Sequence, residues 1–509
     1  MPPQAPAADG GIAATEVPSA GVRAGEEDRR TSVFLRRLVF TLVSVSAITL
    51  AMWATESPDV VAVLPYFFVA ITLQFLPMFW PGDADAFSPA ALPALLFGPE
   101  LVGEALRAIR SGSVEVAFLS GLPPSMRVEL VQRVLAMWIL SSVAYILGFY
   151  LGVGRRRVAG IFPKVTGLVW DKNRLTIASG FCFAMFLFAY TFFQSRVSSS
   201  VADVTSLAQG KAVWREDPTM SWMGRSILLG FIPLLFLVAA VSERPTWRRV
   251  LFAGTFSLVM ALLATRLGQR GYGFMFGLSC LIVVHNVYRR FKIGVLAALA
   301  CIALIVFNIM GDWRRGEVDE GPTTSLRGPL ASRPTAPERV LFAYAGDRNR
   351  LSVLATVMYY VPDRQDYFLG ESYVALLAAP IPKWIWPEKQ DYFKWRDASI
   401  VGNLHGIPAP VPIHGVLYAN FSWAGVAIGM FLWGLFQRGL YQWLQESRKD
   451  KSRALLYSGM VLYLAPSSLA LASTLQYVVP IWLIIKFAGR RPRPAALPRR
   501  DVVARGATT

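Results

Sequence analysis

The hydrophobic residues of this chain fall into long uninterrupted blocks and do not alternate with polar positions. Two examples are Leu38–Ala54 and Val60–Trp80. Because a helix rises about 1.5 Å per residue, about 20 apolar residues cross a hydrocarbon layer of about 30 Å. The pattern therefore predicts an all-α polytopic integral membrane protein.

The chain contains twelve such blocks, which predicts about 12 transmembrane helices. The block at 89–106 is short and contains three prolines. We count it because leaving it out would move the arginines at 155–157 to the opposite side of the membrane. Pro466 divides the last apolar region in two. The predicted blocks are 38–54, 60–80, 89–106, 128–152, 175–193, 226–241, 250–265, 271–288, 293–311, 415–436, 455–469 and 471–487.

Positive charge at the ends of the blocks predicts the topology. Short cytoplasmic loops are rich in Lys and Arg, and four arginines lie between positions 29 and 37. Alternation then places most other basic clusters on the same side, so both termini are predicted to be cytoplasmic. The predicted units are a disordered tail 1–37, a membrane domain 38–311 with helices 1–9, a large extracytoplasmic loop 312–414, a membrane domain 415–488 with helices 10–12, and a basic tail 489–509.

Composition excludes several classes of protein. Of the 509 residues, 54% are hydrophobic and 17% are charged, whereas soluble domains carry about 25% charged residues. This excludes a soluble enzyme, a disulfide-stapled secreted scaffold and, despite the net charge of +18, a nucleic-acid-binding protein. The few cysteines and histidines have no paired spacing, so we expect no metal site and no cofactor.

The segment between the ninth and tenth blocks is far longer than the other connections, and long connections are usually functional. Its pattern predicts an amphipathic helix at Val340–Val361 and a short helix at Gly370–Ala379. The aromatic-rich stretch Ile381–Trp395 follows. Aromatic faces beside charged groups suit a carbohydrate, and they also suit a belt that anchors the loop to membrane lipid. Both interpretations hold for a lipid-linked sugar.

Four short motifs in this part of the chain carry a family resemblance. They are Asp347-Arg348-Asn349-Arg350, Gly370-Glu371-Ser372-Tyr373, the stretch from Pro380 to Lys389 with its Trp-Pro-Glu-Lys ending, and Leu417-Tyr418-Ala419-Asn420-Phe421-Ser422. Together they resemble the diagnostic region of the O-antigen polymerase (Wzy-type) family of oligosaccharide repeat-unit polymerases. Ser422 stands where the family usually has glycine, a departure that we expect to matter little.

The resemblance implies a GT-C-like glycosyltransferase that polymerises polyprenyl-diphosphate-linked oligosaccharide repeat units on the outer face of the cytoplasmic membrane. The donor and the acceptor would both be polyprenyl-diphosphate-linked glycans. A chain-length regulator and a flippase would be candidate partners, and the product would be O-antigen, capsule or exopolysaccharide.

Such a reaction needs cations for the leaving diphosphate and a base for the attacking hydroxyl. Arg266 and Arg270 lie on a short predicted outer turn, where they would bind diphosphate or else extend to lipid headgroups. The motif match adds Arg348 and Arg350. The candidate bases are Asp347, Glu371, His405 and His414, and we expect His414 at the membrane surface, where it could equally be an ordinary helix-end residue. Further candidate substrate contacts are Glu371, Lys383, Trp384, Trp386, Lys389, Tyr418 and Asn420.

Two other signals bear on function. Asp83-Ala84-Asp85 has the spacing of a metal and nucleotide-sugar site, but it lies on a short connector, and we interpret it as two acids in a polar loop. The alternative functions are an O-antigen ligase-like transferase and a polysaccharide flippase or transporter. Mid-block positions are nearly free of charge, which argues against a transporter.

Overall fold

The computed structural model describes most of the chain between residues 57 and 490. The described ranges are 57–79, 87–114, 121–151, 155–200, 227–243, 245–266, 270–291, 350–378, 411–463 and 471–490, together with residues 45, 46, 50, 85, 116, 119, 381, 385, 386 and 388. The predicted block 293–311 lies outside these residues, as does nearly all of block 38–54.

Each of the other predicted blocks contains a helix. Within the described residues, four helices are long and apolar enough to cross a membrane, at Pro58–Met78, Pro124–Tyr150, Lys172–Phe192 and Ile413–Gln445. The chain is therefore a mostly helical protein with several candidate membrane spans, and the count of twelve stays a prediction. The helices are α2 (Pro58–Phe79), α3 (Leu92–Ser111), α4 (Pro124–Tyr150), α5 (Arg155–Ala159), α6 (Lys172–Ser200), α9 (Phe231–Glu243), α10 (Trp247–Arg266), α11 (Arg270–Val287), α14 (Arg350–Tyr360), α15 (Glu371–Ala378), α18 (Ile413–Gln445), α19 (Lys451–Tyr463) and α20 (Leu471–Ala488), with a 3-10 turn η1 at Ile227–Gly230.

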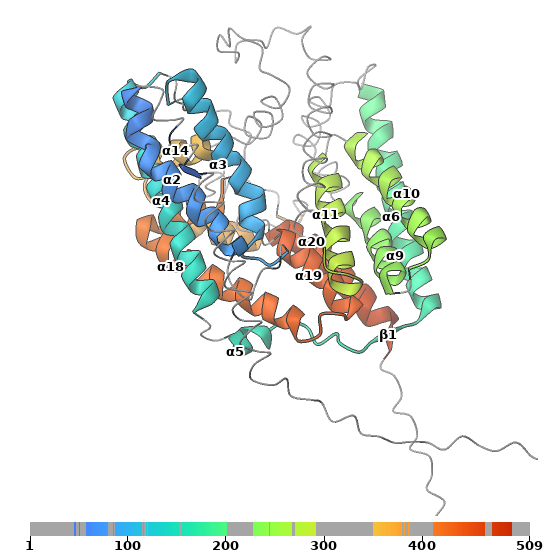
Figure 1. Cartoon of the computed structure of the whole chain (residues 1–509). Helices are drawn as coiled ribbons and strands as arrows, with labels where there is room; N and C mark the ends of the chain where they lie inside the picture. Colours follow the sequence, from blue (N-terminus) through green and yellow to red (C-terminus); the bar gives the residue numbers. More distant parts are fainter. Residues whose placement is uncertain are drawn as a thin grey trace, which may run out of the picture.

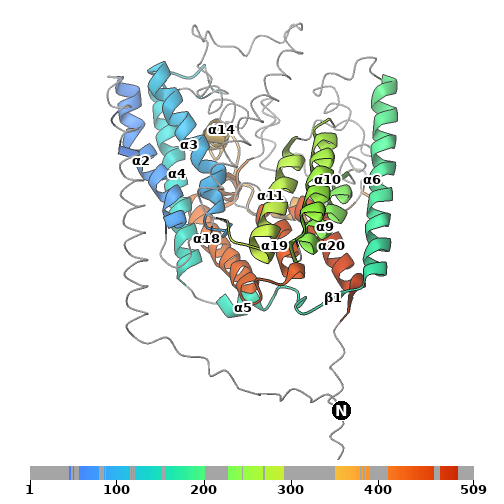
Figure 2. The same ribbon diagram turned by 45° about the vertical axis from the view of Figure 1, so that its right-hand side comes forward.

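The helices form two groups that lie side by side (Figures 1 and 2). We call α2, α3, α4 and α14 the first group, and α6, α9, α10, α11, α19 and α20 the second group. Helix α18 packs along α4 and leads into α19, so it joins the two groups. Gly148 of α4 and Gly434 of α18 allow this close packing, because a Cβ atom at either position would collide with the backbone of the other helix.

Helix α18 turns back sharply near its start, contrary to the single span predicted at 415–436. Ser422 has φ 58° and ψ −156°, a backbone conformation that favours glycine. The limb 413–420 folds back beside the limb that begins at 423, since Gly425 and Gly429 both lie against Leu417. In a straight helix, positions eight residues apart would be separated by about 12 Å. Ser422 therefore places a β-carbon at a strained backbone position.

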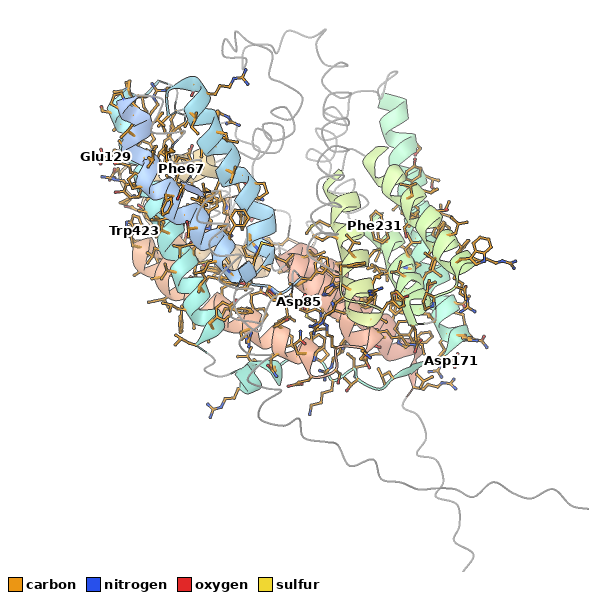
Figure 3. The ribbon with its side chains drawn as sticks, viewed as in Figure 1. Phe67, Asp85, Glu129, Asp171, Phe231 and Trp423 are labelled. Atoms are coloured by element: carbon orange, nitrogen blue, oxygen red, sulfur yellow. The ribbon has the colours of Figure 1, made fainter. Side chains whose placement is uncertain are left out.

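Asp85 joins the two helix groups, so its interpretation as an acid in a polar loop was wrong, whereas Asp83 lies outside the described residues. The Asp85 carboxylate is only 8% exposed, and in Figure 3 it lies between the groups. Its oxygens lie 3.0 Å from His285 Nε2 of α11, 2.6 Å from Arg448 Nη2 just after α18, and 3.1 Å from the Tyr441 hydroxyl. We call these four residues the Asp85 cluster.

A small two-stranded sheet joins two segments that are far apart in the sequence. Strand β1 (Val169–Trp170) pairs antiparallel with β2 (Gly489–Arg490), with Val169 opposite Arg490. Asp171 then begins α6 by accepting hydrogen bonds from the backbone N–H groups of Asn173 and Arg174, and it also pairs with Arg490 at 2.7 Å. Connectors that the charge pattern predicts to be cytoplasmic thus contact one another. Their side of the membrane stays a prediction.

Candidate functional site

Helix α14 is the first described part of the long segment 312–414, and it inserts into the first helix group. Of the helix predicted at Val340–Val361, the part Arg350–Tyr360 is confirmed, and 340–349 lies outside the described residues. The amphipathic character is wrong for the described part, because every residue from Arg350 to Met358 is buried. Helix α14 packs against α4 and against α18, where Leu354 covers Gly415. A segment predicted to be a surface loop therefore contributes to the interior of the bundle.

Arg350 begins α14 and is anchored to α3. Its guanidinium lies 3.1 Å from the carboxylate of Glu100 and 4.5 Å from the centre of the Phe97 ring. Its backbone N–H donates to the same carboxylate at 2.9 Å. A carboxylate at a helix N-terminus is favourable because the first N–H groups of a helix have no intrahelical partner. Glu100 therefore contacts both the backbone N–H and the guanidinium of Arg350.

His414 lies inside the helix bundle, and its predicted position at the membrane surface stays a prediction. It begins the short first limb of α18 and is 3% exposed. Its ring lies 5.1 Å from that of Trp138 in the middle of α4. Among the residues that the structure describes, none forms a hydrogen bond with its Nε2 atom. A deeply buried, unpartnered imidazole nitrogen calls for an explanation.

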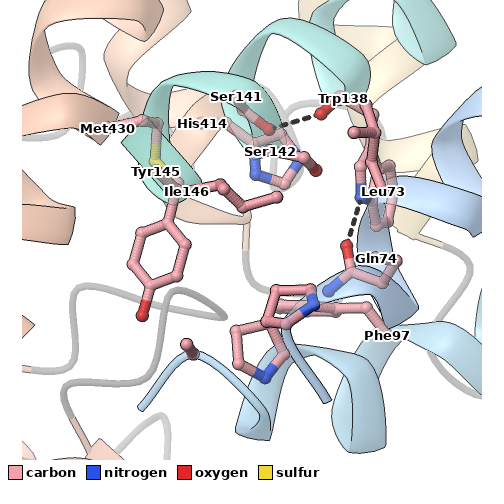
Figure 4. A pocket seen from close by; sticks show the side chains of 13 residues that line it. Leu73, Gln74, Phe97, Trp138, Ser141, Ser142, Tyr145, Ile146, His414 and Met430 are labelled. Carbon is pink, nitrogen blue, oxygen red and sulfur yellow. Dashed lines mark hydrogen bonds between the residues drawn. The ribbon is translucent and has the colours of Figure 1, made fainter. Parts of the chain in front are cut away.

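The imidazole faces a cavity between α2, α3, α4 and α18 (Figure 4). The cavity has an empty volume of about 400 Å³, part of it open to the exterior. Gln74 accepts a hydrogen bond from the Trp138 indole at 3.2 Å, and Tyr145 donates to the Pro89 carbonyl at 2.8 Å. None of its 13 lining residues, all described, carries a formal charge. The cavity suits an uncharged hydroxyl group and not a diphosphate.

The turn in α18 organises a second part of the site. The Asn420 side chain accepts a hydrogen bond from the Gly370 N–H at 3.0 Å and donates to the Val416 carbonyl at 2.7 Å. Tyr418 donates to the Val361 carbonyl at 3.3 Å. These contacts hold the exposed Glu371, at the start of α15, beside the turn. Helix α15 confirms the short helix predicted at Gly370–Ala379.

The structure brings some of the predicted site residues together. Arg350 and His414 lie near the cavity, while Glu371, Tyr418 and Asn420 gather at the turn in α18. Trp386 is described and part-buried. Arg266 ends α10 and Arg270 begins α11, both in the second helix group, and their side chains lie outside the described residues. The predictions for Asp347, Arg348, Lys383, Trp384, Lys389 and His405 also fall outside the described residues.

Sequence reasoning missed Glu100, Gln74 and Trp138. Glu100 had a usable signal, since an acidic residue inside an apolar block predicts a buried partner. Gln74 is also a polar residue inside an apolar block, but it is uncharged, so it predicts a buried partner less strongly. Trp138 had none, because a tryptophan in an apolar helix is ordinary.

Comparisons with family models, with curated proteins and with solved structures find no match. The functional assignment therefore rests on the residues and their geometry, and the family resemblance stays a prediction.

Proposed function

We propose that this protein polymerises polyprenyl-diphosphate-linked oligosaccharide repeat units at the outer face of the cytoplasmic membrane. The observation that carries the proposal is the position of Arg350 and His414. Arg350 belongs to the first of the four motifs that resemble the O-antigen polymerases, and His414 lies just before the last of them, which begins at Leu417. They lie close together beside one uncharged cavity, connected by the rings of Phe97 and Trp138, whose centres lie 5.9 Å apart.

In the proposed reaction, His414 serves as the general base. His414 Nε2 accepts the proton of an acceptor sugar hydroxyl as that oxygen attacks the donor's anomeric carbon. The bond from this carbon to the diphosphate breaks, and polyprenyl diphosphate leaves with the bonding electrons. His414 then releases its proton to water. The bond that breaks supplies the driving force, so the reaction needs no nucleotide.

The leaving diphosphate needs cations from elsewhere in the chain. Arg350 is a poor candidate for this role, because Glu100 already balances its charge and Phe97 covers its guanidinium face. Arg266, Arg270 and Arg348 remain the proposed diphosphate ligands, since the guanidinium fork donates hydrogen bonds in pairs. The exposed Glu371 and the aromatic residues that follow it are proposed to contact the glycan.

Deleting the gene should leave single repeat units attached to lipid or to the final acceptor, because assembly and translocation precede polymerisation. The lipid fraction and the surface glycan can be sized by mass spectrometry. Lipid-linked single repeats confined to the cytoplasmic face would indicate a flippase. Full-length polymer that collects on polyprenyl diphosphate would indicate an O-antigen ligase-like transferase. Either of these two results would contradict the proposal.

A further inference from the structure

Glu100 is the most deeply buried carboxylate near the cavity. Glu100 is 1% exposed and lies in the middle of helix α3. Burying an ionised carboxylate is costly unless it is paired. Here one oxygen accepts the Arg350 backbone N–H and the other lies 3.1 Å from the Arg350 guanidinium. These two contacts tie the start of α14 to the middle of α3.

Arg350 lies near His414, because its guanidinium packs on the Phe97 ring, and the Trp138 ring lies between those of Phe97 and His414. Arg350 and His414 belong to neighbouring segments, since Leu354 of α14 packs on Gly415, the residue that follows His414. The other titratable side chain that lines the cavity is Tyr145 of α4, and it is neutral near pH 7. The positive charge of Arg350 disfavours a second positive charge on the imidazole, unless a negative charge balances it.

We propose that Glu100 is a positioning residue for His414. Its carboxylate fixes the start of α14 and balances the charge of Arg350, and the imidazole can therefore take up a proton during transfer. Glu100 does not itself touch the substrate. The role in transfer rests on the proposed function, whereas the electrostatic link between Glu100 and His414 does not.

The test uses the imidazole signals of the purified full-length protein. The chain has 3 histidines, so ¹⁵N-histidine labelling gives three residues to resolve, and His414→Gln assigns one of them. At fixed pH, Glu100→Gln should shift the His414 signals and leave those of His285 unchanged. The matched control is Glu104→Gln, one turn along α3, where the carboxylate pairs with Arg107 at 3.2 Å. This variant should leave the His414 signals in place.

Transfer kinetics give the second readout. Glu100→Gln should lower kcat about tenfold or more with little change in KM, because acceptor binding is retained while proton transfer is slowed. Glu100→Asp keeps the charge and should recover part of kcat. Unchanged His414 signals in Glu100→Gln, or an equal shift in Glu104→Gln, would overturn the proposal even if the protein makes polymer. Shifted signals in a protein that makes no polymer would support the link and count against the proposed function alone.

If Glu100→Gln does not accumulate, the double variant Glu100→Gln with Arg350→Met takes its place. It removes both charges together, so it should accumulate and keep the His414 signals close to those of the parent. Signals displaced as far as those of Arg350→Met alone would overturn the proposal.

Discussion

Replacing His414 with glutamine should reduce polymer formation by about 10²- to 10⁴-fold, the usual loss when a general base is removed. Glutamine can still form a hydrogen bond near the position of Nε2, but it cannot take up the hydroxyl proton. His414→Ala should therefore be as inactive as His414→Gln. The measurement is the initial rate of chain extension by the purified protein, with protein abundance checked in parallel.

His285→Gln provides the matched control for this prediction. His285 is as buried as His414, but it contacts Asp85, and its Nδ1 accepts the Phe291 backbone N–H at 3.0 Å. The same substitution there should lower stability and leave the turnover of the folded fraction unchanged. Activity in His414→Gln close to that of the parent would mean that a hydrogen bond is sufficient at this position, and His414 would not be the base.

Asp85→Asn should reduce the free energy of unfolding by about 3–5 kcal/mol, because it leaves the part-buried Arg448 without its carboxylate partner. The asparagine has nearly the same shape, so the loss reports the missing charge and not a cavity. Since Asp85 holds the two helix groups together, the first sign should be separation of these groups. Thermal unfolding in detergent, with limited proteolysis of the connector 80–91, measures both effects.

The difference in the free energy of unfolding between the parent and Asp85→Asn should depend on pH with a definite sign. Burial alone raises the pKa of Asp85, but the contact with His285 and the charge of Arg448 outweigh it and hold the pKa well below its usual range. The stabilisation is therefore present above the unfolded pKa of about 3.9 and is lost as the pH falls through the folded value. The difference between the parent and Asp85→Asn should stay constant from about pH 5 to about pH 8.

Asp171→Asn is the control for the Asp85 prediction. Asp171 pairs with Arg490, whose side chain is largely exposed, and asparagine begins a helix about as well as aspartate. Asp171→Asn should therefore change the free energy of unfolding only slightly. A loss in Asp85→Asn no larger than that in Asp171→Asn would contradict the role given to the Asp85 cluster.

The sequence predicted well those parts of the fold that depend on local composition. Helices α2 and α4 follow from long apolar runs, and α15 follows from the short pattern after Gly370. The turn in α18 could not be predicted, because Phe421 and Ser422 lie in an apolar run without proline. The conformation of Ser422 depends on packing between Leu417 and the two glycines at 425 and 429.

The buried ion pairs show a second limit of sequence analysis. The partners of Asp85 lie 200 and 363 residues along the chain, at His285 and Arg448, so no local spacing predicts them. Arg350 was predicted through the family resemblance, and His414 through its place just before an apolar block and the ability of histidine to titrate near neutrality. Their burial was not, because a hydropathy pattern cannot distinguish a surface loop from a segment that folds back into the bundle.

The most direct test of the proposed polymerase is transfer by the purified protein in lipid vesicles. Purified polyprenyl-diphosphate-linked repeat units are added without nucleotide, and the products are separated by size. We expect a ladder of glycans spaced by one repeat unit, with polyprenyl diphosphate released in step. The ladder should be absent with His414→Gln. Repeat units that remain single in the presence of folded, active-site-intact protein would contradict the account.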